Sequence, residues 1–324
     1  MWIWRGLLAL LALAVVGLAA GAVWQWRCEI GDVRAYPPPG RMVEVGGGRR
    51  LHLRCEGAGP SVVMLAGGGT PSVVSYGLQD RLAAFSRACS YDRPGLGWSD
   101  RAAAPMTLTD HIADLDRLLA QVPGPVILVP ESFGALIAIG YAQRHPDRVA
   151  GIVFVDGAEP ATWRDTMAGV NPLEGAAREV LMQAATRTGI VRLVLPRLLP
   201  PWVAELPPRT QGQIRALYSR PAPGLGEAMT AFRRTPPAEW PRSDPGALGA
   251  LPVVVLSHGQ ASSEVTPAFE KMWPVGQARL VALTVPPARQ VVAAGAGHAI
   301  AEEQPDLVAR AVRGLISPPS APPP

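Results

Sequence analysis

The chain has 324 residues, of which 48% are hydrophobic and 17% charged, with a formal net charge of +4. This composition excludes a disordered chain, and the length allows one large domain with an insertion or two smaller domains. Nearly all the basic residues are arginines, scattered along the sequence without interleaved aromatic residues, so no nucleic-acid-binding surface is predicted.

The first predicted element is an apolar segment, residues 6–24, that contains no charged residue. Its 19 residues approach the ~20 that a membrane-spanning helix needs. Tryptophans flank both ends and Arg5 lies on the short side, so the positive-inside rule places the N-terminus in the cytoplasm and the rest of the chain outside it. We expect residues 1–34 to form a membrane anchor and linker. The alternative is a signal peptide cleaved near Ala22, where small residues fit a cleavage site.

Beyond a proline-rich linker at residues 36–40, short apolar segments alternate with helical ones. The segments 41–45 and 50–55, separated by three glycines, are typical of a β-hairpin. Apolar strands that alternate with helices indicate a mostly parallel sheet covered on both faces. The further predicted strands are 61–65, 87–91, 125–129, 151–155, 251–256 and 289–294.

The alternation stops for about ninety residues after the strand that ends at residue 155. This stretch is rich in proline, arginine and helix-forming residues and stands between two strands of one pattern. We therefore predict a helical insertion, about 158–250, within a single domain of residues 35–318. A closing helix is expected at about 304–316, followed by a disordered proline-rich tail, 319–324.

Ser132 is the first candidate for a chemical role. It lies between a predicted strand and an apolar helical segment, at the sheet edge where parallel α/β sheets bind ligands. A serine hydroxyl is a weak nucleophile, so it needs a base, an acid that orients the base, and donors for the developing oxyanion. The turn reads PESFG, with Pro130 where the G-x-S-x-G signature has glycine. Alone, this turn fits a serine helix cap equally well.

His298 is the best candidate base, because it lies in a loop of small residues between the last predicted strand and the closing helix. His258, which follows the strand after the insertion, is its rival. Two residues remain open as the orienting acid, Asp156 at the end of the strand before the insertion and Glu264 beyond His258. Asp156 is favoured because a rigid strand end fixes the imidazole tautomer.

A glycine-rich loop, LAGGGTPS (65–72), follows the third predicted strand. Its backbone N–H groups have no side chains in front of them, so they can approach an oxyanion. We expect the amide of Gly67 or Gly68 to pair with that of Phe133 as an oxyanion hole. A plain flexible loop would also contain such glycines.

Several of these motifs occur in a recognisable order: LHLRCEG, VVMLAGGG, CSYDRPGLGWSD, VPESFGALIAIGYAQRHPDRVAGIVFVDGAEP and GAGHAIAEEQPDLV. They resemble the α/β-hydrolase superfamily, particularly exported or membrane-anchored bacterial members similar to the proline iminopeptidase and haloalkane dehalogenase branch. The resemblance covers about 36–316. It implies an α/β-hydrolase fold, an eight-stranded, mostly parallel sheet with helices on both faces and a helical cap. The family order of nucleophile, acid and histidine is met by Ser132, Asp156 and His298.

The family resemblance also bears on the cysteines. The family sheet places the strand with Cys55 antiparallel to the strand with Cys89, so we predict a disulfide between them, as an exported protein permits. Cys28 is then free or intermolecular. The chain departs from the family pattern at Pro130 and Glu131, where glycine and histidine are usual.

These features predict a serine hydrolase of the carboxylesterase kind, anchored outside the cytoplasm through residues 6–24 or secreted after cleavage. We expect a small-molecule ester substrate and neither a metal nor an organic cofactor. The oligomeric state stays open. The alternatives are amide or peptide hydrolysis, cofactor-free peroxidation, and a non-catalytic binding protein with the same fold.

Overall fold

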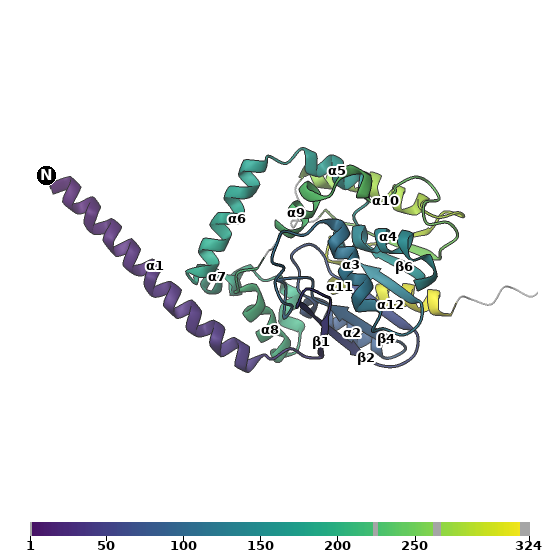
Figure 1. Ribbon diagram of the computed structural model, residues 1–324, viewed down its shortest axis with the longest axis horizontal. Helices are drawn as coiled ribbons and strands as arrows, with labels where there is room; N and C mark the ends of the chain where they lie inside the picture. Colours follow the sequence, from purple (N-terminus) through teal and green to yellow (C-terminus); the bar gives the residue numbers. More distant parts are fainter. Residues whose placement is uncertain (1, 223–225, 262–266, 318–324) are drawn as a thin grey trace, which may run out of the picture. The chain divides into compact units, whose positions relative to one another are not determined.

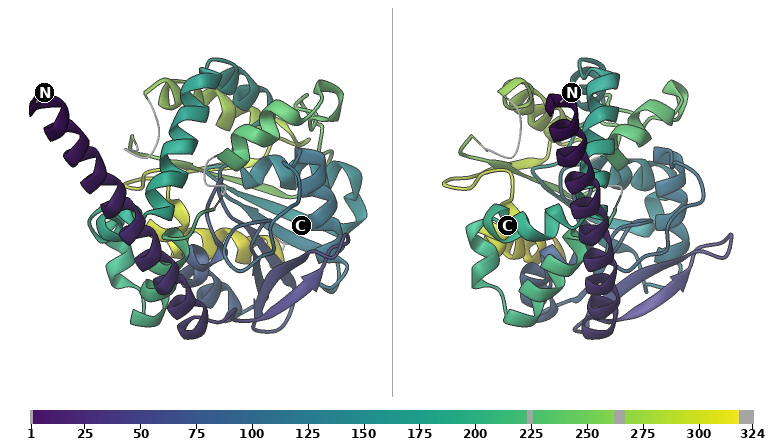
Figure 2. Two further views of the ribbon diagram at one scale, coloured as in Figure 1. Left: turned by 60° about the vertical axis from the view of Figure 1, so that its left-hand side comes forward. Right: turned by 90° about the vertical axis from the view of Figure 1, so that its left-hand side faces the viewer.

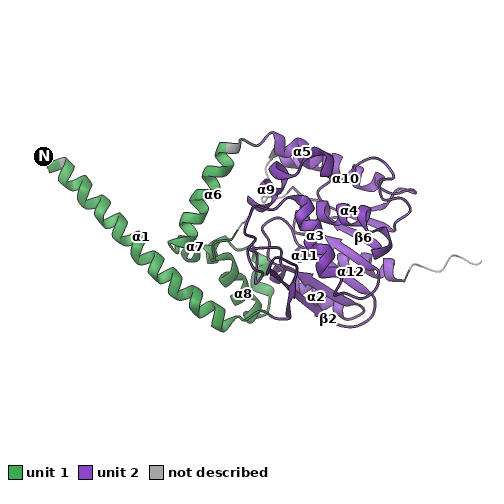
Figure 3. Cartoon of the chain, viewed as in Figure 1, with its two compact units in different colours: residues 1–38, 171–222 green, residues 39–170, 223–324 purple. Residues whose placement is uncertain are grey.

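The computed structural model describes residues 2–222, 226–261 and 267–317. The predicted disordered tail, 319–324, and the alternative acid Glu264 lie outside these described residues. The chain divides into two compact units (Figure 3). Unit 1 combines residues 1–38 with residues 171–222, and unit 2 combines residues 39–170 with residues 223–324.

Unit 2 contains the predicted eight-stranded sheet, in the order β1-β2-β4-β3-β5-β6-β7-β8 (Figure 1). β2 pairs antiparallel with β1 and β4, and the other neighbours are parallel. The order places β5, β6 and β7 side by side, so their carboxyl ends meet at one edge. The strands are β1 (Arg41–Glu44), β2 (Arg50–Glu56), β3 (Ser61–Leu65), β4 (Arg87–Tyr91), β5 (Val126–Pro130), β6 (Val149–Val155), β7 (Val253–His258) and β8 (Arg289–Ala293).

Helices cover both faces of this sheet (Figure 2), as the apolar strands predict. One buried cluster joins the sheet to α3, α4, α5 and α10, and a second joins it to α2, α11 and α12. The helices of unit 2 are α2 (Tyr76–Ala83), α3 (Leu108–Leu119), α4 (Gly134–Arg144), α5 (Pro160–Ala168), α9 (Gly226–Arg234), α10 (Pro267–Ala282), α11 (Ile300–Glu303) and α12 (Pro305–Ile316).

Helix α3 shows how the sequence specifies these layers. Thr107 caps its first turn and forms a reciprocal capping box with Asp110. Ile112, Leu115 and Leu119 repeat at helical spacing and are buried against the sheet. Each such side chain contributes about 1.5–3 kcal/mol through its burial.

Unit 1 consists of the N-terminal helix α1 (Trp2–Ala35) and the middle of the insertion. The insertion contributes α6 (Pro172–Arg187), α7 (Ile190–Leu198), a 3₁₀ turn (Pro201–Glu205) and α8 (Pro208–Tyr218). Among the described residues, α1 is the helix that is long and apolar enough to cross a membrane, and a signal sequence would meet the same criteria. Its mean hydropathy reaches 2.5.

A disulfide joins Cys55 to Cys89 across the antiparallel pair β2 and β4. The two residues are direct register partners, and their Cα atoms are 4.0 Å apart, within the ~7 Å limit for bridging. Cys28 is a free thiol. The predicted pairing of the cysteines therefore agrees with the structure.

Replacing Cys55 and Cys89 together by alanine should destabilise unit 2 by about 3–4 kcal/mol, because the bond closes a loop with a sequence separation of 34. Urea unfolding of the double variant and the wild type measures this difference. Cys28→Ser is the matched control and should unfold like the wild type. Three reactive thiols in the denatured, unreduced wild-type chain, instead of one, would disprove the bond.

Candidate active site

Ser132 stands in a sharp turn between β5 and α4, with φ of 45°. This left-handed conformation is strained for a residue with a side chain. The backbone ladder continues past Pro130, because the N–H of Glu131 donates to Leu65 O at 2.9 Å and that of Ser132 donates to Val155 O at 3.4 Å. Proline at position 130 therefore interrupts neither of these backbone hydrogen bonds.

Two glycines let the backbone close around this turn. A Cβ at Gly134 would collide with the carbonyl oxygen of Leu65, so the start of α4 can approach β3 only with glycine. A Cβ at Gly67 would lie 3.5 Å from the Cβ of Ser132. The predicted oxyanion loop and Ser132 are thus neighbours.

Asp156 comes directly after β6, beside Ser132 in the sheet, and its side chain has no exposed surface. Its φ is also 45°. In the described part of the chain, Ser132 and Asp156 are the two residues other than glycine with positive φ. Such strain costs about 1–3 kcal/mol per residue and concentrates at functional sites.

His298 lies in the loop after β8, and its Nδ1 is 2.6 Å from Asp156 Oδ2. When Nδ1 carries the proton of this hydrogen bond, Nε2 is the basic nitrogen of the ring. The structure therefore brings the predicted base and the favoured acid together across 142 residues of sequence.

His258 joins the same carboxylate, which the sequence did not indicate. Its Nδ1 lies 2.7 Å from Asp156 Oδ2, and its backbone N–H donates to Oδ1 at 3.1 Å. Its Nε2 is 3.2 Å from Glu270 Oε2 in α10. His258 thus lies at the end of β7, the strand after the insertion, where many family members carry the acid. This position in the sequence was the one indication that His258 could contact the acid.

The charges of this group depend on one another. The hydrogen bond to Asp156 raises the pKa of His258, against the lowering effect of burial, and the charges of Asp156 and Glu270 raise it further. Burial by itself raises the pKa of Asp156, but the hydrogen bonds from His258 and His298 outweigh burial and lower it. Asp156 is therefore an ionised acceptor shared by two imidazoles.

The same three residues are the candidate metal ligands of the described chain. The ligand atoms of Asp156, His258 and His298 all lie within 4.8 Å of one another. Both Nδ1 atoms are within hydrogen-bond distance of the carboxylate, so these hydrogen bonds explain the cluster without a cation.

The glycine-rich loop, residues 65–72, has backbone donors that could serve the predicted oxyanion hole. Within the described residues, the backbone N–H groups of Gly68 and Phe133 have no hydrogen-bond acceptor. A Cβ at Gly68 would lie 3.5 Å from the Cβ of Phe133, so the two residues are adjacent. The next amide, that of Gly69, instead donates to Glu227 Oε2 at 3.2 Å.

A buried ion pair holds this loop, and sequence reasoning missed it. The guanidinium of Arg93 donates to the carbonyl oxygens of Ala66 and Gly67, both at 2.6 Å. It also donates to Glu227 of α9, at 2.7 and 2.9 Å. Burial lowers the pKa of Arg93, but Glu227 raises it by more. The pair is enclosed and fixes the loop through its carbonyls.

A row of aromatic side chains in mutual contact runs from Phe133 to His298. Phe269 and Trp273 of α10 stack with ring centroids 4.3 Å apart, and Trp273 meets His298 edge-on at 5.3 Å. Trp163 of α5 lies between Phe269, at 5.8 Å, and Phe133, at 6.2 Å. We call this row of rings the aromatic wall.

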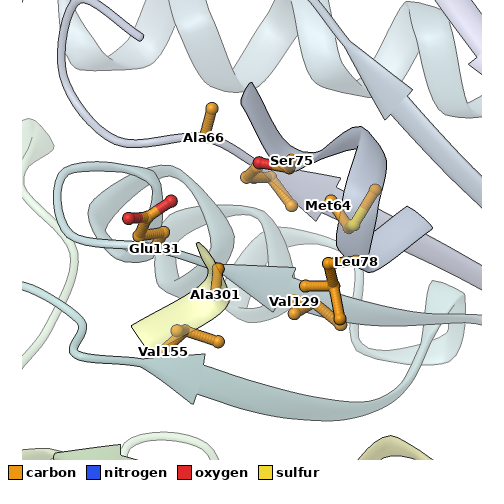
Figure 4. Close-up of a pocket in the computed structure, with 9 residues that line it drawn as sticks. Met64, Ala66, Ser75, Leu78, Val129, Glu131, Val155 and Ala301 are labelled. Atoms are coloured by element: carbon orange, nitrogen blue, oxygen red, sulfur yellow. The ribbon is translucent and has the colours of Figure 1, made fainter. Parts of the chain in front are cut away.

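A small pocket lies beside the turn, with Glu131 in its lining (Figure 4). Its polar groups are the Glu131 carboxylate and the Ser75 hydroxyl, and aliphatic side chains form most of its walls. The described residues that line it include none of Ser132, Asp156 and His298. Glu131 therefore lines a pocket whose lining does not include the three candidate catalytic residues.

Comparison with known proteins agrees with this architecture. The profile described as "Alpha/beta hydrolase family" matches residues 62–311, more than half of the chain. The chain belongs to the alpha/beta hydrolase family. A haloalkane dehalogenase from Sphingobium indicum is 28% identical over 289 residues, which cover 83% of this hydrolase and 92% of that protein.

Two further similarities involve esterases. A pimeloyl-[acyl-carrier protein] methyl ester esterase from Chromobacterium violaceum is 42% identical over 107 residues, 32% of this hydrolase and 40% of that protein. The structure of a thermophilic esterase from Thermogutta terrifontis matches with a TM-score of 0.59 at 21% identity, over 84% of this hydrolase and 95% of that chain. The structural likeness is one of fold alone.

Glu227→Gln should destabilise the hydrolase by about 3–5 kcal/mol, because it leaves the buried Arg93 guanidinium without its counter-charge. Denaturant unfolding measures the loss. Glu205→Gln, at an exposed glutamate, is the matched control and should change stability by less than about 0.5 kcal/mol. Equal stabilities of the two variants would contradict the role of the ion pair.

His258→Gln should destabilise the hydrolase more at pH 6 than at pH 9. The folded-state pKa of His258 is raised, so its stabilisation is complete below the unfolded pKa of ~6.5 and declines as the pH rises through the folded pKa. Thermal melting of both proteins at the two pH values tests this. In an Asp156→Asn background the dependence should shrink. A pH-independent difference would refute the shared carboxylate.

Proposed function

We propose that this alpha/beta hydrolase is a serine esterase that cleaves small carboxylic esters through an acyl-enzyme. The observation that carries the proposal is the strained backbone shared by Ser132 and Asp156, joined to the hydrogen bond between Asp156 and His298. Strain at both positions fits residues that are held for chemistry. A helix cap, the simpler reading of Ser132, requires no left-handed backbone.

In the proposed reaction, Ser132 Oγ attacks the ester carbonyl while His298 Nε2 takes its proton. The developing oxyanion is held by the free amides of Gly68 and Phe133, with Gly67 as the alternative donor. His298 then returns the proton to the leaving alcohol. Water clears the acyl-enzyme by the same base, and Asp156 stabilises the imidazolium throughout.

The choice of an ester rests on the nucleophile and on the aromatic wall. Haloalkane and epoxide chemistry in the family uses an aspartate nucleophile, whereas position 132 is serine. Phe269 and Trp273 beside His298 suit an apolar acyl or alcohol group. Similarity to the methyl ester esterase supports the same choice.

We further propose that α1 remains as an anchor and that unit 2 acts outside the cytoplasm. The disulfide between Cys55 and Cys89 supports an oxidising compartment. The charge-free length of residues 6–24 and the position of Arg5 support the orientation.

The purified full-length hydrolase should react with a fluorophosphonate probe at Ser132. Ser132→Ala should abolish the labelling, because it removes the proposed nucleophile, and Ser75→Ala, in the pocket beside the turn, should label like the wild type. If the folded wild-type protein does not react with the probe, the proposal that it is a serine hydrolase is wrong.

The same preparation distinguishes the two candidate acids. Asp156→Asn should lower kcat on p-nitrophenyl esters by up to about 10⁴-fold, because it removes the group that fixes the tautomer of His298. Glu264→Gln should leave kcat within about twofold. If Glu264→Gln lowers kcat strongly and Asp156→Asn does not, Glu264 is the acid that orients His298. Esters of graded acyl length then give the chain-length preference.

A further inference from the structure

Helices α6 and α7 of unit 1 expose large apolar side chains. Leu173, Val180 and Leu181 of α6, and Leu193 and Leu198 of α7, are between 60% and 79% exposed. A single exposed leucine is ordinary, but contiguous helices that expose several usually mark an interaction surface. We call these five side chains the apolar face of unit 1.

The two helices that carry the apolar face adjoin α1 at the turn between them. The turn between α6 and α7 packs on α1, because a Cβ at Gly21 would collide with the carbonyl oxygen of Thr188. A Cβ at Gly189 would come within 2.8 Å of the Trp24 ring. Glycine at both positions therefore allows a close approach between α1 and the insertion.

The contact falls at a defined level of α1. Residues 6–24 extend for roughly 28 Å as a helix, close to the ~30 Å of a bilayer hydrocarbon core. Gly21 and Trp24 stand in the last turn of this span, so the α6–α7 turn meets α1 where it leaves the core. Figure 3 shows α6 running across the direction of α1 rather than alongside it.

Immediately after Trp24, polar contacts join α1 to the insertion. Gln25 is buried and donates to Ser219 O at 2.6 Å, and it accepts from Arg192 Nε at 2.8 Å. Arg192 also donates to Asp32 Oδ2 at 2.7 Å. These contacts follow Trp24 in α1, so they belong to the aqueous side and hold the helices at a fixed depth.

We propose that unit 1 docks on the bilayer that α1 spans, with the apolar face of α6 and α7 inserted into its interfacial layer. The occupant of this face is lipid, because its helices adjoin the end of the segment that is proposed above to span the bilayer, within one compact unit. The segment from α6 to α8 also contains six arginines and three glutamates, a balance that favours anionic headgroups. This proposal rests on the anchoring that is proposed above for α1, and it is independent of the chemistry at Ser132.

Depth-dependent quenching in the full-length protein tests the proposal. In a Cys28→Ser background, Leu181→Cys and Leu198→Cys receive an environment-sensitive fluorophore, while the disulfide protects Cys55 and Cys89. Arg209→Cys, at an exposed polar position of α8, is the matched control. The proteins are reconstituted into vesicles of phosphatidylcholine and phosphatidylglycerol, with or without doxyl-labelled lipid.

Doxyl lipid should quench the labels at positions 181 and 198 at least about threefold more than the label at position 209, and iodide should show the opposite order. Strong iodide quenching at positions 181 and 198 would overturn the proposal. So would shielding from both quenchers, which would indicate a protein partner or a second copy.

A second measurement uses the unmodified chain. A phospholipid with a diazirine on its acyl chain should label peptides from residues 172–198 of the wild-type protein in the same vesicles. Labelling confined to the first 24 residues would reject docking of α6 and α7. Because this measurement uses the wild-type protein, it does not depend on whether the cysteine variants fold.

Discussion

A carboxylate with no exposed surface determines the organisation of unit 2. Asp156 is ionised at the end of β6, and a buried charge persists only with compensating donors. Its donors come from the end of β7, as His258, and from the loop after β8, as His298. Register among three parallel strands is therefore tied to one acceptor, and the strained backbone of Asp156 is tolerated because these contacts fix it.

The glycine loop beside Ser132 contacts a second buried charge with compensating partners, the guanidinium of Arg93. Arg93 neutralises Glu227 and uses its remaining donors on two carbonyls of the glycine loop. Because Glu227 belongs to α9, part of the insertion, the loop depends on a segment far along the chain. Two buried networks of charged groups thus lie near the serine turn. One contains Asp156 at the end of β6, and the other joins Arg93 to Glu227 of the insertion.

The sequence predicts most of the fold, because apolar strands and their turns are local signals. Strands such as β3 (61–65) and β4 (87–91) have the predicted bounds, and the cysteine pairing follows from family topology. His258 as a partner of Asp156, 102 residues away, and Glu227 as the partner of Arg93, 134 residues away, could not be predicted. Which buried charges pair depends on tertiary packing, and no local pattern encodes it.

The polar end of α1 has a practical consequence for preparing a water-soluble form. Deleting residues 1–38 would remove Gln25 and Asp32, and so leave Arg192 and the carbonyl of Ser219 without these partners. A form that begins at Gln25 would lose the apolar segment but retain every one of these contacts. Solubility requires removal of the apolar segment, which ends at residue 24, whereas the polar contacts of the insertion require the chain from Gln25 onward. A water-soluble form should therefore start at Gln25 and not after residue 38.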